Sequence, residues 1–378
     1  MSREIFQEIN TKISANKVQI KEIKDQLKPK KKRLAVKYKG REIVVRKPKI
    51  VADLPSKVVL TDSTWQFVEI YLRSKKQDDA LFYWEQARNF YESTKTLSLV
   101  SKPLTAYYCF LNATKALLEV KNIGYDLSHG VTGKKIDGHF RIQNEIVKFQ
   151  PAGVVSGLGV YLGENVPAGG QEFTLKDIFY NLPYIHRAFT ITYDRRPELF
   201  IPILEPRFVH EKSEKKGWLE IKLEQEHSNA HMLRKLNGYG LDGLYDNSVS
   251  YTLRRNKKFK WEVNNTVPTD DSLNKIQAYH KKMRKELRYI YSSNALWYVK
   301  RKDLANNVID KSTLTLTIAA MHRLSELSRY NPQVLSKHLE KDASWLLTEF
   351  INKSIYQFID QISSEITGND FRVTGFRD

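Results

Sequence analysis

The feature of this sequence that most constrains its fold is a pair of aromatic-rich helical patterns that ends at Leu118. In each pattern the apolar residues recur every three or four positions, the spacing of one face of an α-helix. The first contains Leu81, Trp84, Ala87 and Tyr91, and the second contains Leu104, Tyr107, Tyr108, Leu111 and Leu118. Asp78 and Asp79 stand where the first helix should be capped, and Pro103 stands at the first position of the second. We therefore expect two buried helices that pack antiparallel.

Length and composition fit a folded protein of two or three domains. The chain has 378 residues, of which 41% are hydrophobic, and this is enough to build separate cores. Its one cysteine, Cys109, lies in an apolar helical pattern, so we expect a small core residue, no disulfide and a reducing cytoplasm. No apolar run approaches about 18 residues and no signal-peptide pattern is present, so we expect no transmembrane segment.

Positive charge is concentrated at the start of the chain. The formal net charge is +19, and residues 1–60 hold 17 Lys and Arg against 6 Asp and Glu. Such a concentration of positive charge can bind nucleic acid, anionic lipid or an acidic protein, and charge alone does not distinguish among these ligands.

A heptad pattern occupies the first 27 residues. One heptad position holds Phe6, Ile13, Ile20 and Leu27, and the other holds Ile9 and Ile23, with Asn16 completing that series. Three heptads predict a coiled coil, formed by self-association, with a partner protein or against the body of the same chain. A long amphipathic helix docked on its own domain, with Asn16 facing a polar gap, is the alternative.

A basic arm follows this helix after Pro29. Its cationic residues are Lys28, Lys30, Lys31, Lys32, Arg33, Lys37, Lys39 and Arg41. Apolar residues alternate with the later cations around a Lys39-Gly40 turn, which predicts a hairpin or edge strand with one cationic face. That face can bind phosphates, but lysine on an edge strand also prevents pairing between sheets. Pro48 and Pro55 then suggest a linker.

The order of patterns predicts an α+β fold that is mainly helical. We expect the heptad helix and basic arm at residues 1–60 and an N-terminal helical lobe at 61–150, opening with a capped helix after Ser63. A β-rich antiparallel insert should occupy 151–270, and a C-terminal helical portion that packs on the first lobe should occupy 271–378.

The predicted insert begins with a glycine-rich segment at residues 151–170. It contains no G-K-[ST] and no G-x-G-x-x-G motif, so we predict a strand and turn and not a phosphate-binding loop. Residues 174–182 predict a short capped helix. The alternating or β-branched segments AFTITY, LFIPIL, WLEIKL and VSYTLRR then predict an antiparallel sheet between about residues 186 and 265.

Helical periodicity returns near Ser272. One face of this predicted helix holds Ile276, Tyr279, His280, Met283 and Leu287, and the other holds Lys281, Lys282, Arg284, Lys285 and Arg288. The basic face is a second candidate for contact with an anion, or an ordinary solvated surface. Further helices are predicted at residues 313–328 and 345–366.

Several motifs resemble those of one bacterial family. They are a helix that ends in ARNFY, a P-L-x-x-Y-Y-x-F-L-N-x-x-K-A-L-L helix, a following His129-Gly130, and LSRYNP at residues 327–332. In this combination the chain resembles the YaaC-like family, and the motifs bracket residues from about 80 to about 340. The polar residues at the motifs are Arg88, Asn112, Lys115, His129, Arg329 and Asn331. We expect them to form a buried network between the two helical portions, with His129 capping a helix C-terminus or bonding another buried group.

The resemblance to the family's defence members implies a bacterial cytoplasmic, non-enzymatic sensor or adaptor. It would recognise a phage product made early in infection and recruit a partner protein that disrupts membrane, and so reach a membrane surface only through that partner. The alternative is an abortive-infection ribonuclease of a divergent HEPN type, or a nucleic-acid-binding protein.

A search for catalytic motifs favours the first of these. No histidine follows an arginine at the HEPN spacing of four to six intervening residues, and no G-x-S-x-G motif is present. His227 and His231 have the i, i+4 spacing of paired metal ligands, but neither H-E-x-x-H nor a third ligand can be named. We therefore expect no catalytic site, no metal and no cofactor.

Overall fold

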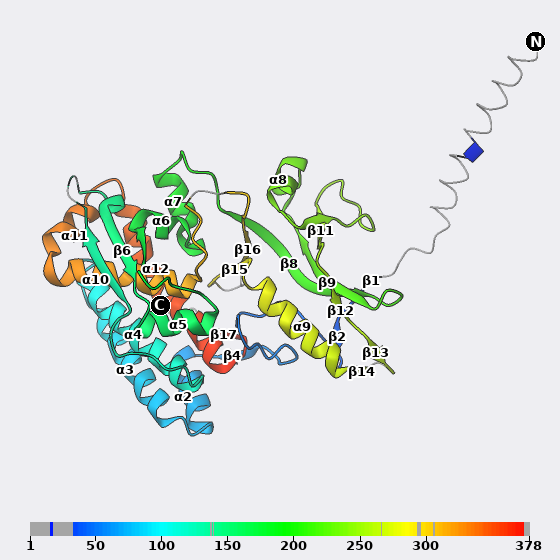
Figure 1. Cartoon of the computed structure of the whole chain (residues 1–378), viewed down its shortest axis with the longest axis horizontal. Helices are drawn as coiled ribbons and strands as arrows, with labels where there is room; N and C mark the ends of the chain where they lie inside the picture. The colour runs from blue at the N-terminus through cyan, green and yellow to red at the C-terminus, as the bar shows by residue number, and fades with distance from the viewer. Residues whose placement is uncertain are drawn as a thin grey trace, which may run out of the picture.

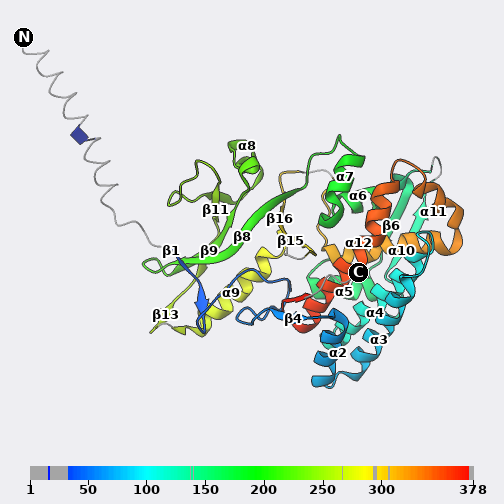
Figure 2. The same ribbon diagram turned by 180° about the vertical axis from the view of Figure 1, so that it is seen from behind.

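Two lobes make up the protein, and each has its own hydrophobic core. The computed structural model describes residues 16–17, 33–136, 138, 140–265, 267–292, 296–304 and 307–373. Within these, the helical lobe comprises residues 59–200 and 309–373, and the β lobe comprises residues 33–54 and 201–300. Figure 1 shows the two lobes side by side, joined where α5 and β15 lie, and Figure 2 shows the same arrangement from behind. The predicted heptad helix and residues 28–32 of the basic arm lie outside the described residues, apart from Asn16 and Lys17.

Helices build most of the helical lobe. They are α2 (Thr64–Ser74), α3 (Asp78–Thr94), α4 (Lys102–Val120), α5 (Val154–Leu162), α6 (Leu175–Tyr180), α7 (His186–Thr192), α10 (Thr313–Tyr330), α11 (Pro332–Leu339) and α12 (Ser344–Thr367). A three-stranded antiparallel sheet of β5 (Val131–Lys135), β6 (Glu145–Phe149) and β7 (Gln171–Thr174) covers part of them. Two short strands, β4 (Val59–Thr61) and β17 (Phe371–Val373), pair in parallel. No helix in the described part of the chain combines the length and apolar character needed to cross a membrane.

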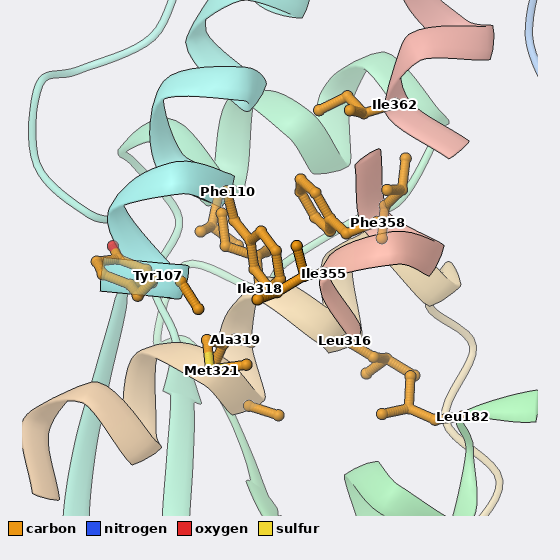
Figure 3. Close-up of a cluster of buried hydrophobic side chains, with 14 of the residues drawn as sticks. Tyr107, Phe110, Leu182, Leu316, Ile318, Ala319, Met321, Ile355, Phe358 and Ile362 are labelled. Carbon is orange, nitrogen blue, oxygen red and sulfur yellow. The ribbon is translucent and has the colours of Figure 1, made fainter. Parts of the chain in front are cut away.

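Helix α4 lies at the centre of this lobe. It packs against α3, α5, α10 and α12. Lys115 late in α4 lies over the Tyr83 ring early in α3, so the two helices run antiparallel as predicted. The Phe110 ring stacks on Phe358 of α12 with centroids 4.2 Å apart. Figure 3 shows these two rings within a cluster that side chains of α4, α10 and α12 build. Burial of such rings is the main stabilising term, at about 1.5 to 3 kcal/mol for each large apolar side chain.

The β lobe is an antiparallel sheet covered on one face by a helix. The sheet order is β10-β11-β9-β8-β16-β15, and β1 and β12 add to β8 and β9. Its strands are β1 (Arg33–Ala35), β8 (Phe200–Glu211), β9 (Lys216–Lys222), β10 (Tyr239–Leu241), β11 (Thr252–Arg255), β12 (Phe259–Lys260), β15 (Leu287–Ile290) and β16 (Leu296–Lys300). Helix α9 (Asp270–Met283) packs its apolar face on the sheet, and α8 (Ala230–Lys235) lies at the far edge. Two small hairpins, β2 (Lys37–Tyr38) with β3 (Arg41–Glu42) and β13 (Val263–Asn264) with β14 (Val267–Pro268), complete it.

The predicted α+β class, the β-rich antiparallel part and the basic hairpin are confirmed. Two local predictions are wrong. The glycine-rich segment forms α5, because Gly153, at φ +113°, starts the helix and Gly163, at φ +70°, ends it. The segment AFTITY lies largely in α7, where Ala188 and Phe189 are buried, so packing overrides its β propensity. As a result, residues 154–200 contribute to the helical core, and the sheet of the β lobe begins only at β8.

The segment predicted as a linker is instead a buried strap, residues 43–54, between the lobes. Lys47 is buried, and its Nζ lies 2.8 Å from Asp360 Oδ1 of α12. The main-chain nitrogen of Lys49 donates a hydrogen bond of 2.6 Å to Glu365 Oε1 on the same helix. The two prolines misled the prediction, because proline also suits an extended strap whose other main-chain amides donate to side chains of neighbouring elements.

Candidate functional site

The motif histidine, His129, lies in a tight loop where Gly130 packs closely against Gly153. The Ser128 and His129 carbonyls accept hydrogen bonds from the Val154 and Val155 amides, at 2.9 and 3.1 Å, so the loop sits on the start of α5. Gly130 has φ +75°. A Cβ at this position would lie 3.0 Å from the Ala152 carbonyl oxygen and 3.1 Å from the Ser156 nitrogen. Only glycine suits this position, because both the backbone conformation and the space exclude a side chain.

Replacing Gly130 by alanine tests this explanation of the motif. We expect the free energy of unfolding to fall by about 1 to 2 kcal/mol, the cost of a left-handed conformation in a residue with a Cβ. Urea denaturation of the purified chain measures the change. Gly124→Ala is the control, since a Cβ there meets nothing within 4 Å. Equal stability of the two variants would contradict the explanation.

Three aromatic side chains meet beside the middle of α10, which carries His322. The Tyr107 hydroxyl and His129 Nδ1 form a hydrogen bond of 2.6 Å, and the His322 ring lies edge-on to Tyr107 at 4.9 Å. Burial, together with the neighbouring His129 and Arg323, lowers the pKa of His322 to about 3. Partial burial and the nearby Lys115 lower the pKa of His129, and burial raises the pKa of Tyr107. Near neutral pH His322 is therefore uncharged, and Tyr107 keeps its proton.

A buried ionic cluster lies beside these rings. Glu145 of β6 is fully buried, and its two oxygens contact Arg323 Nη2 at 2.7 Å and His338 Nε2 at 3.0 Å. Arg323 Nη1 also donates to Glu326 at 2.9 Å. Burial alone would raise the pKa of Glu145, but the hydrogen bonds from His338 and Arg323 outweigh it and leave that pKa below its usual value. The cluster joins β6, α10 and α11, and every member has an intramolecular partner.

A family model described as YaaC-like protein matches residues 57–366. The chain belongs to the YaaC-like family. Searches of curated proteins and of solved structures gave no match. The matched range starts after the strap and includes most of both lobes.

Most of the YaaC-like motif residues do not converge in the predicted network. Arg88 is half exposed and lies 3.6 Å from Glu69, and Asn112 donates to the Tyr108 carbonyl of its own helix. Lys115 lies 5.1 Å from the Tyr83 ring centroid, and the exposed Arg329 covers its neighbour Tyr330. Asn331 joins α10 to α11. These side chains point outward or along their helices, so the network that ties the elements together is the Glu145 cluster.

The capping prediction for His129 is also wrong, and the alternative of a bond to a buried group holds. Helix α4 ends at Val120, but His129 reaches Tyr107 near the start of the helix. Tyr107 was not predicted as the partner of His129, although the family motif contains this tyrosine. Glu145, Arg323 and His338 were not predicted either, because no short motif links these positions.

The described part of the basic arm divides into two environments. Lys37, Lys39 and Arg41 are exposed on the β2–β3 hairpin. Arg33 instead lies 2.7 Å from Glu211 and 4.5 Å from the Trp218 ring centroid. Arg33 is therefore part of the β-lobe structure and does not belong to a free cationic surface.

Cys109 and His227 lie in different surroundings. The Cys109 thiol is buried in the core as expected, and burial raises its pKa. His227 lies with Glu224 and Glu226, and one ligand atom from each falls within 4.8 Å of the others, but His231 is not in this group. The three are surface groups, and His227 forms an ion pair with its neighbour Glu226 at 3.3 Å.

The predicted basic face of α9 is not one continuous surface. Helix α9 ends at Met283, and the chain turns before β15. This turn leaves Lys281, Lys282 and Lys285 exposed but buries Arg284 and Arg288 where the lobes meet.

Proposed function

We propose that this YaaC-like protein is a non-enzymatic sensor and adaptor of anti-phage defence. In this role it recognises a product made early in phage infection and recruits a partner protein that disrupts membrane. Within the family the sequence is most like JukA, the sensor half of a two-component system called jumbo phage killer. The proposal rests on that resemblance and on family membership.

The observation that best supports a binding role is that Glu145, the buried carboxylate near the motif histidine, is already paired. His129 is hydrogen-bonded to Tyr107, and the nearby carboxylate Glu145 is held by Arg323 and His338. A general acid or base needs a free position within hydrogen-bond reach of a substrate, and a buried carboxylate with two cationic or histidine partners lacks one. These groups therefore suit a rigid scaffold that presents its surfaces to other proteins.

Affinity capture from infected cells tests the proposal. Tagged full-length protein is recovered early in infection and from uninfected cells, and the retained proteins are identified by mass spectrometry. We expect a phage-encoded protein only in the infected sample, and a bacterial protein that, once purified, releases dye from phosphatidylglycerol vesicles. A sample that holds neither protein would contradict the sensor role.

The exposed cations of the hairpin distinguish this role from nucleic-acid binding. In the alternative, replacing Lys37, Lys39 and Arg41 by serine would weaken binding to RNA or DNA and reduce its salt dependence. Replacing the exposed Lys57, Lys75 and Lys76 removes the same charge elsewhere and is the control. We expect neither cleavage of RNA or DNA nor a difference between the two triple variants. Cleavage that depends on His129 or Arg329 would favour the ribonuclease alternative.

A further inference from the structure

A cavity of about 300 Å³ lies where the two lobes meet. The helical lobe contributes the segment after α5 and the segment before α10, which are residues 163–165 and 309–312. The β lobe contributes Lys285 and Arg288, and the strap contributes Lys49. This volume is at the lower end of the range for sites that bind small molecules.

Positive charge dominates the lining of this interlobe pocket. Four cationic residues line it, Lys49, Lys285, Arg288 and Lys311, against the two carboxylates Glu164 and Asp310. Lys300 is buried behind the lining and donates a hydrogen bond of 2.6 Å to the Ile309 carbonyl. Buried charges are ordinarily paired, so a surplus of cations around a cavity calls for an anion from outside the chain.

In the described part of the chain, the hydrogen bonds of Arg288 and Lys311 go to main-chain carbonyls. The Arg288 Nη1 atom donates to the main-chain carbonyls of Arg284, Lys285 and Leu287. Lys311 donates to the Asn165 carbonyl at 3.3 Å. Among the described residues, the ion pairs within 4.0 Å include no carboxylate for Arg288, Lys285, Lys300 or Lys311.

The two carboxylates balance only part of the charge of the four cationic residues. Glu164 Oε1 accepts a hydrogen bond of 2.7 Å from the Ser312 amide at the start of α10, and Lys49 Nζ is 4.0 Å away. Asp310 is exposed to solvent. Burial lowers the pKa of Lys49 to about 8 and of Arg288 to about 10, despite the attraction of Glu164. In addition, the N-terminal end of the 18-residue helix α10 brings its positive dipole to this wall.

We propose that the interlobe pocket binds a small oligophosphate, either free or as the phosphate chain of a nucleotide. Two or more negative charges match the cation surplus of the lining, and a planar guanidinium with several lysines is the usual donor set for phosphate oxygens. None of the described residues that line the pocket is aromatic, so the phosphate chain and not a stacked base is the recognised group. Binding here does not require the sensor role proposed above.

Isothermal titration calorimetry on the full-length protein tests this site. The probes are pyrophosphate, tripolyphosphate and ATP at constant ionic strength, with sulfate as the anion control. We expect one binding site per chain and at least tenfold weaker binding of sulfate. Affinity that rises from tripolyphosphate to ATP identifies a nucleotide ligand, whereas equal affinity identifies the phosphate chain alone. Absence of binding by all three phosphates overturns the proposal.

Matched variants locate the site. Lys285→Gln removes an exposed lysine of the pocket, and Lys281→Gln removes an exposed lysine on α9 outside it, so neither should disturb the core. We expect about tenfold weaker tripolyphosphate binding for Lys285→Gln and less than twofold for Lys281→Gln. Arg288→Gln should abolish binding, with circular dichroism confirming its fold. Equal effects of the two lysine variants overturn the assignment.

The basic arm is a competing site for the same anions. A variant with serine in place of Lys28, Lys30, Lys31 and Lys32 keeps the interlobe pocket intact. We expect its tripolyphosphate affinity to stay within twofold of the original protein. If this variant loses binding and Lys285→Gln does not, the anion binds to the arm and the proposal is overturned.

Discussion

Replacing Arg323 by leucine is expected to lower the free energy of unfolding by about 3 to 5 kcal/mol, the cost of breaking a buried ion pair by removing one partner. Arg323 donates to Glu145 through Nε at 3.0 Å and Nη2 at 2.7 Å. Glu145 is fully buried, so in the variant its carboxylate keeps only His338 as a side-chain partner among the described residues. Leucine fills part of the space but supplies no hydrogen bond.

Arg329→Leu is the matched control, because it makes the same exchange on the same helix at an exposed position. We expect a change within about 0.5 kcal/mol there. Urea denaturation followed by circular dichroism measures both variants. If the two variants lose similar stability, the Glu145 cluster does not hold β6, α10 and α11 together as described.

Most of the long helices of this fold were predictable because their signals are local. A side-chain cap precedes α2 at Ser63, α6 at Thr174 and α10 at Ser312, and each is a short polar residue before an apolar pattern. The antiparallel pairing of α3 and α4 followed from the short connection between them. Such features depend on residues within a few positions of one another.

The Glu145 cluster was not predictable for the opposite reason. Glu145 and His338 are 193 positions apart in the sequence, and only the folded chain brings them within 3.0 Å. A single sequence also gives no signal that a particular glutamate is buried, since most glutamates are exposed. The motif residues Arg88 and Arg329 were easier to notice, but their side chains are exposed to solvent.

The cationic residues of the interlobe pocket were not predictable for the same reason. The run from Lys281 to Arg288 has the composition of a solvated face, yet the chain turn after Met283 divides it into exposed lysines and buried arginines. Lys49 and Lys300 carried no signal at all, because Lys49 lines the pocket from the strap and Lys300 lies behind its lining at the end of β16. What distinguishes these residues is that they are buried without a carboxylate for each of them.

Lys300 offers a direct measure of that burial through the pH dependence of stability. Burial is the main cause that lowers the pKa of Lys300 from 10.5 to about 7. The charge of Arg288 acts in the same direction, whereas the carboxylates of Asp310 and Glu164 act against it. Between these two values the unfolded chain holds the proton and the folded chain does not, so stability rises with pH. The contribution is absent below pH 7 and reaches about 2 to 3 kcal/mol by pH 9.

Lys300→Met removes this titration and keeps most of the side-chain volume. We expect the free energy of unfolding of the original protein, relative to the variant, to rise by about 2 to 3 kcal/mol between pH 6 and pH 9. Lys49, Arg288 and Lys311 titrate in both proteins, so the difference reports Lys300. Lys281→Met, at an exposed position, should give parallel curves. Parallel curves for Lys300→Met as well would mean that Lys300 keeps an ordinary pKa in the folded protein, which would contradict its burial beside the interlobe pocket.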